Sequence, residues 1–244
     1  APSTRAHSIS YAGNIYSIFG RNKDILVRAA FNGPKYTFNY YGQGNSTQNI
    51  GDDIDYFRVR TKNLSLAAYF QRRFTQAFKA GIGPGYELYW IEKPMNSFIS
   101  SPDFVDKEDL NNPSRFAVLR SYANIDYVDD PLSPTSGVRW NNEINYFSEW
   151  GKANDNFLQL KTDVSFYGTP NFNFPVTAAV RIGAATNIGK YKFFQSNFLG
   201  NTTNLRGYRN NRFAGDSYLY QNSELRFQIS SFRNYIFTGN FGFF

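Results

Sequence analysis

Apolar and polar residues alternate with a period of two along most of this chain, and this alternation restricts the possible folds more than any other feature. In residues 138–150 the even positions are mostly apolar, whereas the odd positions include Arg139, Glu143 and Glu149. Residues 156–168 and 174–187 repeat the pattern. Successive side chains of a strand point to opposite faces of a sheet, so the pattern predicts two-faced β-strands.

We expect eleven strands, separated by segments rich in Gly, Pro, Asn and Asp. Their ranges are 8–19, 24–32, 35–43, 55–72, 76–92, 115–129, 138–150, 156–168, 174–187, 216–229 and 235–244. Short connections at 130–137, 169–174 and 230–234 contrast with long ones at 93–114 and 188–215. Short turns at one end and long loops at the other are typical of transmembrane β-barrels. The sequence therefore predicts one all-β domain, a transmembrane antiparallel β-barrel.

Composition agrees with a barrel in a membrane. The chain has 25 Phe and 18 Tyr among 244 residues, and aromatic side chains form girdles at both membrane interfaces of such barrels. No apolar run approaches the length of about 18 residues that a transmembrane helix needs. The formal net charge of +7 indicates acidic partners, an anionic membrane surface or a basic barrel interior.

The parity of the strands predicts which side chains face lipid and which face the lumen. The apolar parity should point outward, at Trp140, Ile144, Tyr146, Leu158, Leu160, Val164, Val180 and Ile182. The charged parity should point inward, at Arg139, Glu143, Lys161, Asp163 and Arg181.

Residues for catalysis are scarce in this chain. His7 is the single histidine, and the absence of cysteine excludes disulfides and thiolate metal sites. The glycines of 81–85 fall within a predicted strand with no following helix, so they fail the context of a phosphate-binding loop. Basic and aromatic residues alternate in 56–60, but strand alternation explains this better than a nucleic-acid platform. We expect no enzymatic activity, cofactor, metal ion or nucleic-acid partner for the chain itself.

A glycine-punctuated polar loop carries the most distinctive motif, Leu205-Arg206-Gly207-Tyr208. Gly207 allows a tight turn or a close approach to a wall, and Arg206 offers a planar fork of donors to a carboxylate or an aromatic face. Tyr208 can anchor the tip of the loop. On its own the motif is also compatible with an ordinary solvated loop.

Four segments carry a resemblance to a known superfamily. The loop motif and the following Asn222-Ser223-Glu224-Leu225-Arg226-Phe227 resemble the Arg-Gly-aromatic loop and "Glu-Leu-Arg" strand of outer-membrane assembly and translocation barrels. That superfamily comprises BamA, TamA and the two-partner secretion transporters. The segments 127–137 and 240–244 are similar to a family turn and to the start of the next family strand.

The resemblance implies a barrel of sixteen strands, of which this chain would hold the third through the thirteenth. We therefore expect residues 1–244 to be a single barrel domain, incomplete at both ends. The alternative treats Phe244 as a natural C-terminal aromatic residue, but its parity differs from that of the apolar face formed by Tyr235, Phe237, Phe241 and Phe243.

The function implied by the resemblance is protein insertion into, or translocation across, the outer membrane of a Gram-negative cell. The expected partners are outer-membrane lipid, unfolded outer-membrane or secreted proteins and accessory assembly proteins. Two alternatives stay open. Some relatives use the barrel to anchor an N-terminal enzyme, and segments 30–34 and 41–45 resemble the metallophosphoesterase branch. A simple diffusion porin would also have a polar lumen.

The resemblance also implies a role for the loop motif. The family's loop arginine folds back into the barrel and meets an acidic or aromatic partner on the wall, which assigns this role to Arg206. The usual acidic partner follows the strand segment that ends here at Phe244, so Glu224 is the substitute candidate.

Overall fold

A computed structural model describes the backbone of most of the chain. The described ranges are residues 6–47, 54–93, 96–101, 104, 110, 112–152, 155–170, 176–233 and 238–243, with side chains up to residue 227. Ten strands form one sheet in the order β1-β2-β3-β4-β5-β6-β7-β8-β11-β12, and all neighbours are antiparallel. The predicted all-β antiparallel fold is confirmed.

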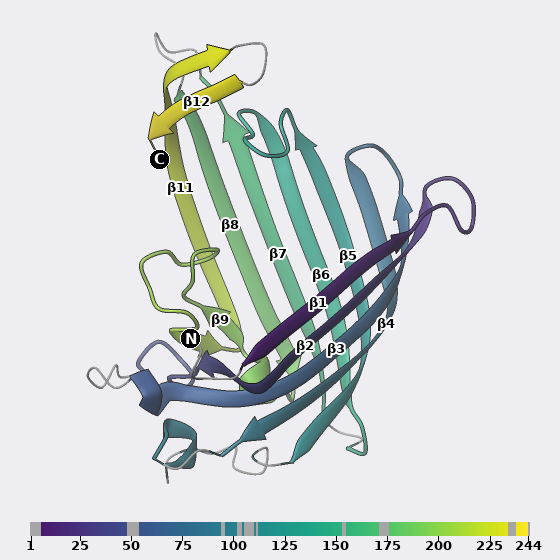
Figure 1. Ribbon diagram of the computed structural model, residues 1–244, viewed down its shortest axis with the longest axis vertical. Helices are drawn as coiled ribbons and strands as arrows, with labels where there is room; N and C mark the ends of the chain where they lie inside the picture. Colours follow the sequence, from purple (N-terminus) through teal and green to yellow (C-terminus); the bar gives the residue numbers. More distant parts are fainter. Residues whose placement is uncertain are drawn as a thin grey trace.

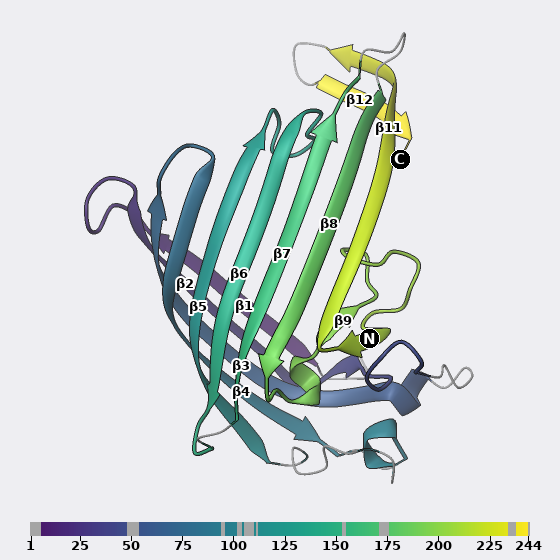
Figure 2. The same ribbon diagram turned by 180° about the vertical axis from the view of Figure 1, so that it is seen from behind.

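The strands of this sheet are long. They are β1 (His7–Ile15), β2 (Lys23–Asn39), β3 (Arg58–Arg73), β4 (Phe78–Glu92), β5 (Pro113–Val128), β6 (Gly137–Glu149), β7 (Asn156–Gly168), β8 (Val176–Gly189), β11 (Ser217–Arg233) and β12 (Thr238–Phe243). Figures 1 and 2 show that the sheet curls strongly, so that β1–β3 cross in front of β6–β8 in Figure 1. Within the described residues, β1 and β12 each pair with one neighbour. No described helix is long and apolar enough to cross a membrane.

The connections differ between the two ends of the sheet. At the short-turn end, β5 and β6 are joined by residues 129–136 and β3 and β4 by residues 74–77. At the long-loop end, β2 and β3 are joined by residues 40–57, which include the 3₁₀ helix η1 (Ile54–Phe57), and the segment before β5 includes η2 (Phe98–Ser100). β8 and β11 are joined by residues 190–216.

The eleven predicted strands become ten because 24–32 and 35–43 belong to one strand, β2. Asn32 pairs with Asn63 and Tyr36 pairs with Thr61, so the three intervening residues oppose Lys62 alone. Pro34 has no N–H to donate to a ladder, and a bulge is one of the few places in a sheet that accepts proline. The Gly-Pro-Lys segment therefore bends a continuous strand where the sequence suggested a hairpin.

Two further boundaries differ from those expected. β11 continues to Arg233, so residues 230–233 of the predicted turn at 230–234 belong to a strand, and residue 234 lies outside the described residues. The predicted loop 188–215 contains short elements of its own. These are η4 (Phe193–Gln195), β9 (Asn197–Leu199) and β10 (Phe213–Gly215), and β9 pairs with β10 as a two-stranded sheet.

The predicted alternation of the strand faces agrees with the register, which places Trp140, Val164 and Ile182 side by side on one face. Trp140, Ile144 and Ile182 are all exposed, as expected for the outward face. Asp163 and Arg181 point to the concave face and form an ion pair with 2.7 Å between Oδ2 and Nε. The parity read from the sequence therefore separates the two surfaces correctly.

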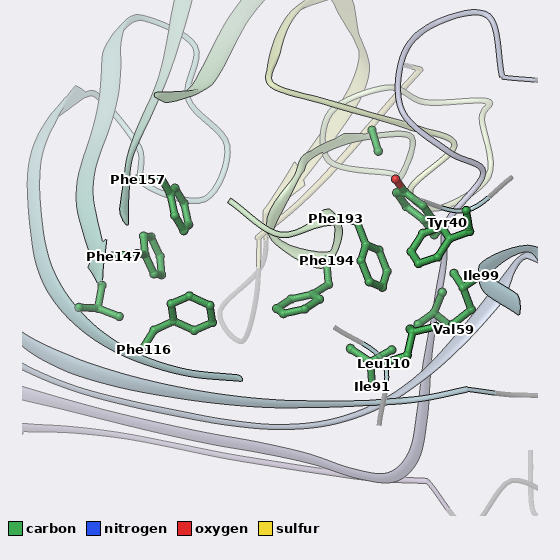
Figure 3. Close-up of a cluster of buried hydrophobic side chains, with 13 residues drawn as sticks. Tyr40, Val59, Ile91, Ile99, Leu110, Phe116, Phe147, Phe157, Phe193 and Phe194 are labelled. Atoms are coloured by element: carbon green, nitrogen blue, oxygen red, sulfur yellow. The ribbon is translucent and has the colours of Figure 1, made fainter. Parts of the chain in front are cut away.

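The main hydrophobic core lies on the concave side at the long-loop end, where side chains of strands and loops meet (Figure 3). Strand residues of this cluster include Val59, Ile91, Phe116, Phe147 and Phe157, and loop residues include Tyr40, Ile99, Phe104, Leu110, Phe193, Phe194 and Ala214. Burying so many rings gives the loops a fixed position, because apolar burial contributes about 25 cal/mol per Å².

Candidate functional site

The candidate site is built on residues 190–216, here called the long loop. The long loop starts at the end of β8 and, in Figure 1, runs back alongside β11. Its first part, residues 191–199, is called the loop base, and residues 201–209 are called the loop tip. The two parts are held by different forces.

Aromatic packing holds the loop base. The Phe193 side chain is fully buried, and its ring lies 5.0 Å from that of Tyr40 and 5.1 Å from that of Phe104, measured between centroids. Phe194 lies 4.7 Å from the ring of Tyr89 on β4. Figure 3 shows both phenylalanines at the centre of the cluster. The loop base thus fills the concave side of the sheet at the long-loop end.

Polar contacts of the loop base complement this packing. Lys192 Nζ lies 3.0 Å from Glu149 Oε1, and both side chains are largely buried. The Tyr191 hydroxyl donates a hydrogen bond to the Asp216 carboxylate. Burial, followed by this carboxylate, raises the pKa of Tyr191 well above its usual value. Tyr191 therefore remains a hydrogen-bond donor at any physiological pH.

The connection between β2 and β3 is hydrogen-bonded to the long loop. Gly44 N donates to Ala214 O at 2.8 Å, and Gln43 forms an isolated bridge with Ala214. The Arg212 guanidinium donates to the side-chain and backbone oxygens of Thr47 at 2.8 and 2.7 Å. It also lies over the Tyr41 ring, 5.1 Å from its centroid. The loops therefore form one connected structure across the sheet.

Hydrogen bonds to the wall hold the loop tip. The tip is organised by Asn204, whose Oδ1 accepts from Gly200 N at 3.0 Å and Leu205 N at 2.7 Å. The Asn204 carbonyl accepts from Asn222 Nδ2 on β11 at 2.9 Å. Arg181 Nη1 on β8 donates to Thr203 O at 2.9 Å. The backbone of the tip is therefore attached to two neighbouring strands.

The structure brings Arg206 and Glu224 together. Arg206 Nη1 lies 3.4 Å from Glu224 Oε2, and the Arg206 side chain is 66% exposed, whereas that of Glu224 is 20% exposed. The other carboxylate oxygen of Glu224 accepts from Arg226 Nε at 2.7 Å. Gly207 has φ of +87°, a left-handed conformation that favours glycine and turns the chain directly after Arg206.

The remaining motif residues point elsewhere. Leu205 is half-buried. Tyr208 is exposed, and its ring centroid lies 5.5 Å from that of Phe213 in β10. Tyr208 thus packs on the loop itself and not on the wall. Arg209 is exposed, while its carbonyl accepts from Arg212 N at 3.2 Å.

Arg226 connects this site to the short-turn end. Its Nη1 donates to the Pro134 carbonyl at 3.1 Å, and its guanidinium lies 5.7 Å from the centroid of the Tyr167 ring. A cavity of about 150 Å³ lies between the loop tip and the wall and is lined by Arg181, Arg206, Glu224 and Arg226, among others. Three arginines and one glutamate around this cavity give it a positive balance.

Sequence reasoning missed four residues of the site: Arg181, Asn204, Asn222 and Arg226. We expected Arg181 to point inside the barrel, but we did not predict its contact with the long loop. The Asn222-Ser223-Glu224-Leu225-Arg226 alternation did carry a signal, since it places three polar side chains on one face of β11. What these side chains meet depends on how the long loop folds.

Comparisons with known proteins place the chain in a family. The model of the Omp85 superfamily domain matches residues 16–242. Among solved structures, the crystal structure of BamA from Haemophilus ducreyi lacking POTRA domains 1-3 is similar, with a TM-score of 0.65 at 15% identity. The match covers 94% of this chain and 46% of that chain, so the present sequence spans about half of its length.

No curated protein matches the sequence significantly. At 15% identity the structural likeness establishes the fold alone, and it agrees with the antiparallel sheet. The family model spans nearly the whole chain, including the long loop and its wall. The chain thus belongs to the Omp85 superfamily.

Proposed function

We propose that this chain is the membrane barrel of a factor that inserts proteins into, or moves them across, the outer membrane of a Gram-negative cell. Its partners in this role are outer-membrane lipid, unfolded outer-membrane or secreted proteins, and accessory assembly proteins. The barrel itself works without catalysis and without a cofactor, by positioning strands and loops.

The attachment of the loop tip to the wall supports this proposal most directly. Arg181, Asn222 and Glu224 all lie on the concave face and contact residues 203–206 of the tip. Each contact is polar, and the Arg206 contact is largely exposed. Exposed ion pairs contribute only about 0–1 kcal/mol, so such a tip can detach and reattach while the loop base stays packed.

A simple diffusion porin is less well supported than a protein-handling barrel. The hydrophobic cluster at the long-loop end joins loop and strand side chains across the concave face (Figure 3). An open aqueous channel requires a polar lining along the path of the solute. We therefore expect negligible steady conductance from the complete protein in planar bilayers. A large open conductance would favour the porin.

A barrel that anchors an N-terminal enzyme remains the second alternative. The metallophosphoesterase branch was suggested by segments 30–34 and 41–45. In the structure the first of these segments lies in β2 and runs into its bulge, and the second belongs to the connection to β3. Measurements of activity distinguish the two proposals. If the barrel is an anchor, the complete protein should hydrolyse phosphoesters, and depletion of this protein should leave the assembly of outer-membrane proteins unchanged.

The decisive experiment compares Arg206→Ala with Arg209→Ala in the complete protein, expressed in a strain that depends on it. Arg206 contacts the wall, whereas the side chain of Arg209 is exposed. We expect Arg206→Ala to impair complementation and lower the level of assembled outer-membrane proteins, while Arg209→Ala behaves as wild type. Wild-type activity from Arg206→Ala at equal expression would remove the role assigned to the loop motif.

A further inference from the structure

A trough runs across the convex face of β3–β6. It has a volume of about 420 Å³, and its lining includes Ala80, Ala123 and Asn142. These residues follow one another in register, because Arg72 pairs with Ala80, Ala80 with Ala123 and Ala123 with Asn142. The row of small side chains starts at Arg72 and crosses four strands.

Bulky side chains form the two banks of the trough. On the bank toward the long-loop end lie Phe70, Ile82 and Ile144, all exposed on the convex face. On the bank toward the short-turn end, Phe74 lines the trough and stacks on Phe78, with ring centroids 5.0 Å apart. Three spacings of about 4.8 Å between four strands give the trough a length of about 14 Å, enough for much of an acyl chain.

Positive charge is concentrated at one end of the trough. Arg72 lies one residue before the end of β3, and Lys23 is its register partner on the same face of β2. The Arg72 guanidinium lies 5.1 Å from the centroid of the Phe74 ring. Within the described part of the chain, neither Arg72 nor Lys23 has an ion pair with a carboxylate, and no acidic side chain lines the trough.

The opposite end of the trough is polar but internally satisfied. Asn142 Oδ1 accepts from Thr162 Oγ1 at 2.8 Å, and Thr162 Oγ1 accepts from Trp140 Nε1 at 2.9 Å. The charged end alone therefore retains unused donors. The residues beside it are aromatic, as at the interface level of a membrane barrel.

We propose that this trough binds a diacyl phospholipid, with one acyl chain along the row of small residues and the phosphate held by Arg72 and Lys23. A guanidinium at the interface matches the planar, bidentate geometry of a phosphate group. The apolar row matches the acyl chain, and the bulky side chains of the two banks restrict the direction in which this acyl chain lies. This site lies on the convex face, away from the long loop, so it is independent of the function proposed above.

The test uses the complete protein, purified in mild detergent, and counts bound phospholipid by native mass spectrometry. We expect wild type to retain one phosphatidylglycerol molecule through detergent exchange. Ala123→Phe fills the trough with an apolar group and should lower retention about tenfold, because a lost apolar fit of a few CH₂ groups is worth at least this factor. Ala184→Phe, on the same face of β8 but outside the trough, is the matched control.

A second variant tests the charged end. Arg72→Gln should weaken phosphatidylglycerol binding about tenfold, because it removes a charged hydrogen bond to the phosphate, and should leave diacylglycerol binding unchanged. Heat-modifiable migration on gels confirms that each variant is folded. Equal retention by wild type, Ala123→Phe and Arg72→Gln would overturn the proposal. So would equal losses in Ala123→Phe and Ala184→Phe, because the site would then be nonspecific lipid contact.

Discussion

The base and the tip of the long loop are neighbours in sequence but are held in opposite ways. The base is held by Phe193 and Phe194, whose rings are buried among aromatic side chains of strands and other loops. The tip is held by hydrogen bonds and one ion pair, with Arg206 mostly exposed. Apolar burial gives a large, nonspecific stabilisation, whereas exposed polar contacts give a small and directional one. A loop built in this way is held firmly at its base and weakly at its tip.

The largest expected effect comes from breaking the loop base. Phe193→Ala should destabilise the complete protein by about 3–5 kcal/mol, because it removes a fully buried ring and leaves a cavity. Thermal unfolding followed by gel migration, with limited proteolysis of residues 190–216, measures this loss. Phe166→Ala, an aromatic residue on the convex face, is the control and should leave proteolysis of the loop unchanged. A small effect of Phe193→Ala would remove the distinction between base and tip.

Glu224→Gln alters the polar contacts of the tip and should have the next largest effect. The substitution weakens contacts to both Arg206 and Arg226. The exposed Arg206 contact contributes about 0–1 kcal/mol, whereas the less exposed Arg226 contact, a charged hydrogen bond, contributes about 1.5–3 kcal/mol. Double-mutant cycles with Arg206→Ala and Arg226→Ala separate the two couplings. We expect the Arg226 coupling to be the larger, because its distance is shorter and its side chain is less exposed. The reverse order would mean that Arg206 is more tightly held than its geometry indicates.

A smaller effect is expected from Asn222→Ala, which removes the hydrogen bond to the Asn204 carbonyl. The loss should be about 1 kcal/mol and should be confined to the tip. Hydrogen exchange would show faster exchange of the Gly200 and Leu205 amides, with unchanged protection of the amides of η4. Gln221→Ala, the adjacent position on the opposite face of β11, is the control. Faster exchange across both tip and base would show that the two parts unfold together.

The smallest effect concerns acid pH at the turn that Arg226 reaches. Asp129 accepts hydrogen bonds from the Thr135 side chain and from the amides of Thr135 and Ser136, and these bonds lower the pKa of Asp129. A lowered pKa means that the stabilisation is present above the unfolded value of about 3.9 and is lost as pH falls below it. Hydrogen exchange of residues 129–136 at pH 7 and pH 3 should reveal loosening that Asp129→Asn no longer shows. Equal pH dependence in both proteins would contradict this role of Asp129.

The sequence was a good guide to the strands and a poorer guide to their interruptions. Alternation placed β6, β7 and β8 within a few residues of their true ends, because successive side chains point to opposite faces along the whole of each strand. It failed at Gly33-Pro34-Lys35, where a break in the pattern marks a bulge within β2 as readily as a turn between two strands. The pairing of β2 with β3 on both sides of the break shows that it is a bulge and not a turn. This pairing involves two strands, so the sequence of β2 alone does not reveal it.

The candidate site divides in a similar way. The Arg-Gly-Tyr motif and the polar face of β11 are visible in the sequence, and the resemblance to a family connected Arg206 with Glu224 as a prediction. The contacts of Arg181 with Thr203 and of Arg226 with Pro134 were not predictable. They join segments separated by 22 and 92 residues, and their formation depends on the curvature of the sheet and the path of the loop.

By itself, the sequence determined that this chain forms two-faced strands, which side of each strand is apolar, and which loop carries the arginine-glycine motif. These properties depend on local chemistry, since side-chain parity and glycine conformation are set within a few residues. The tertiary structure alone decided that β2 is continuous, that the loop base is buried while its tip is exposed, and that Ala80, Ala123 and Asn142 line one trough. These properties depend on register between strands, which arises only when distant segments pair and the whole sheet curves.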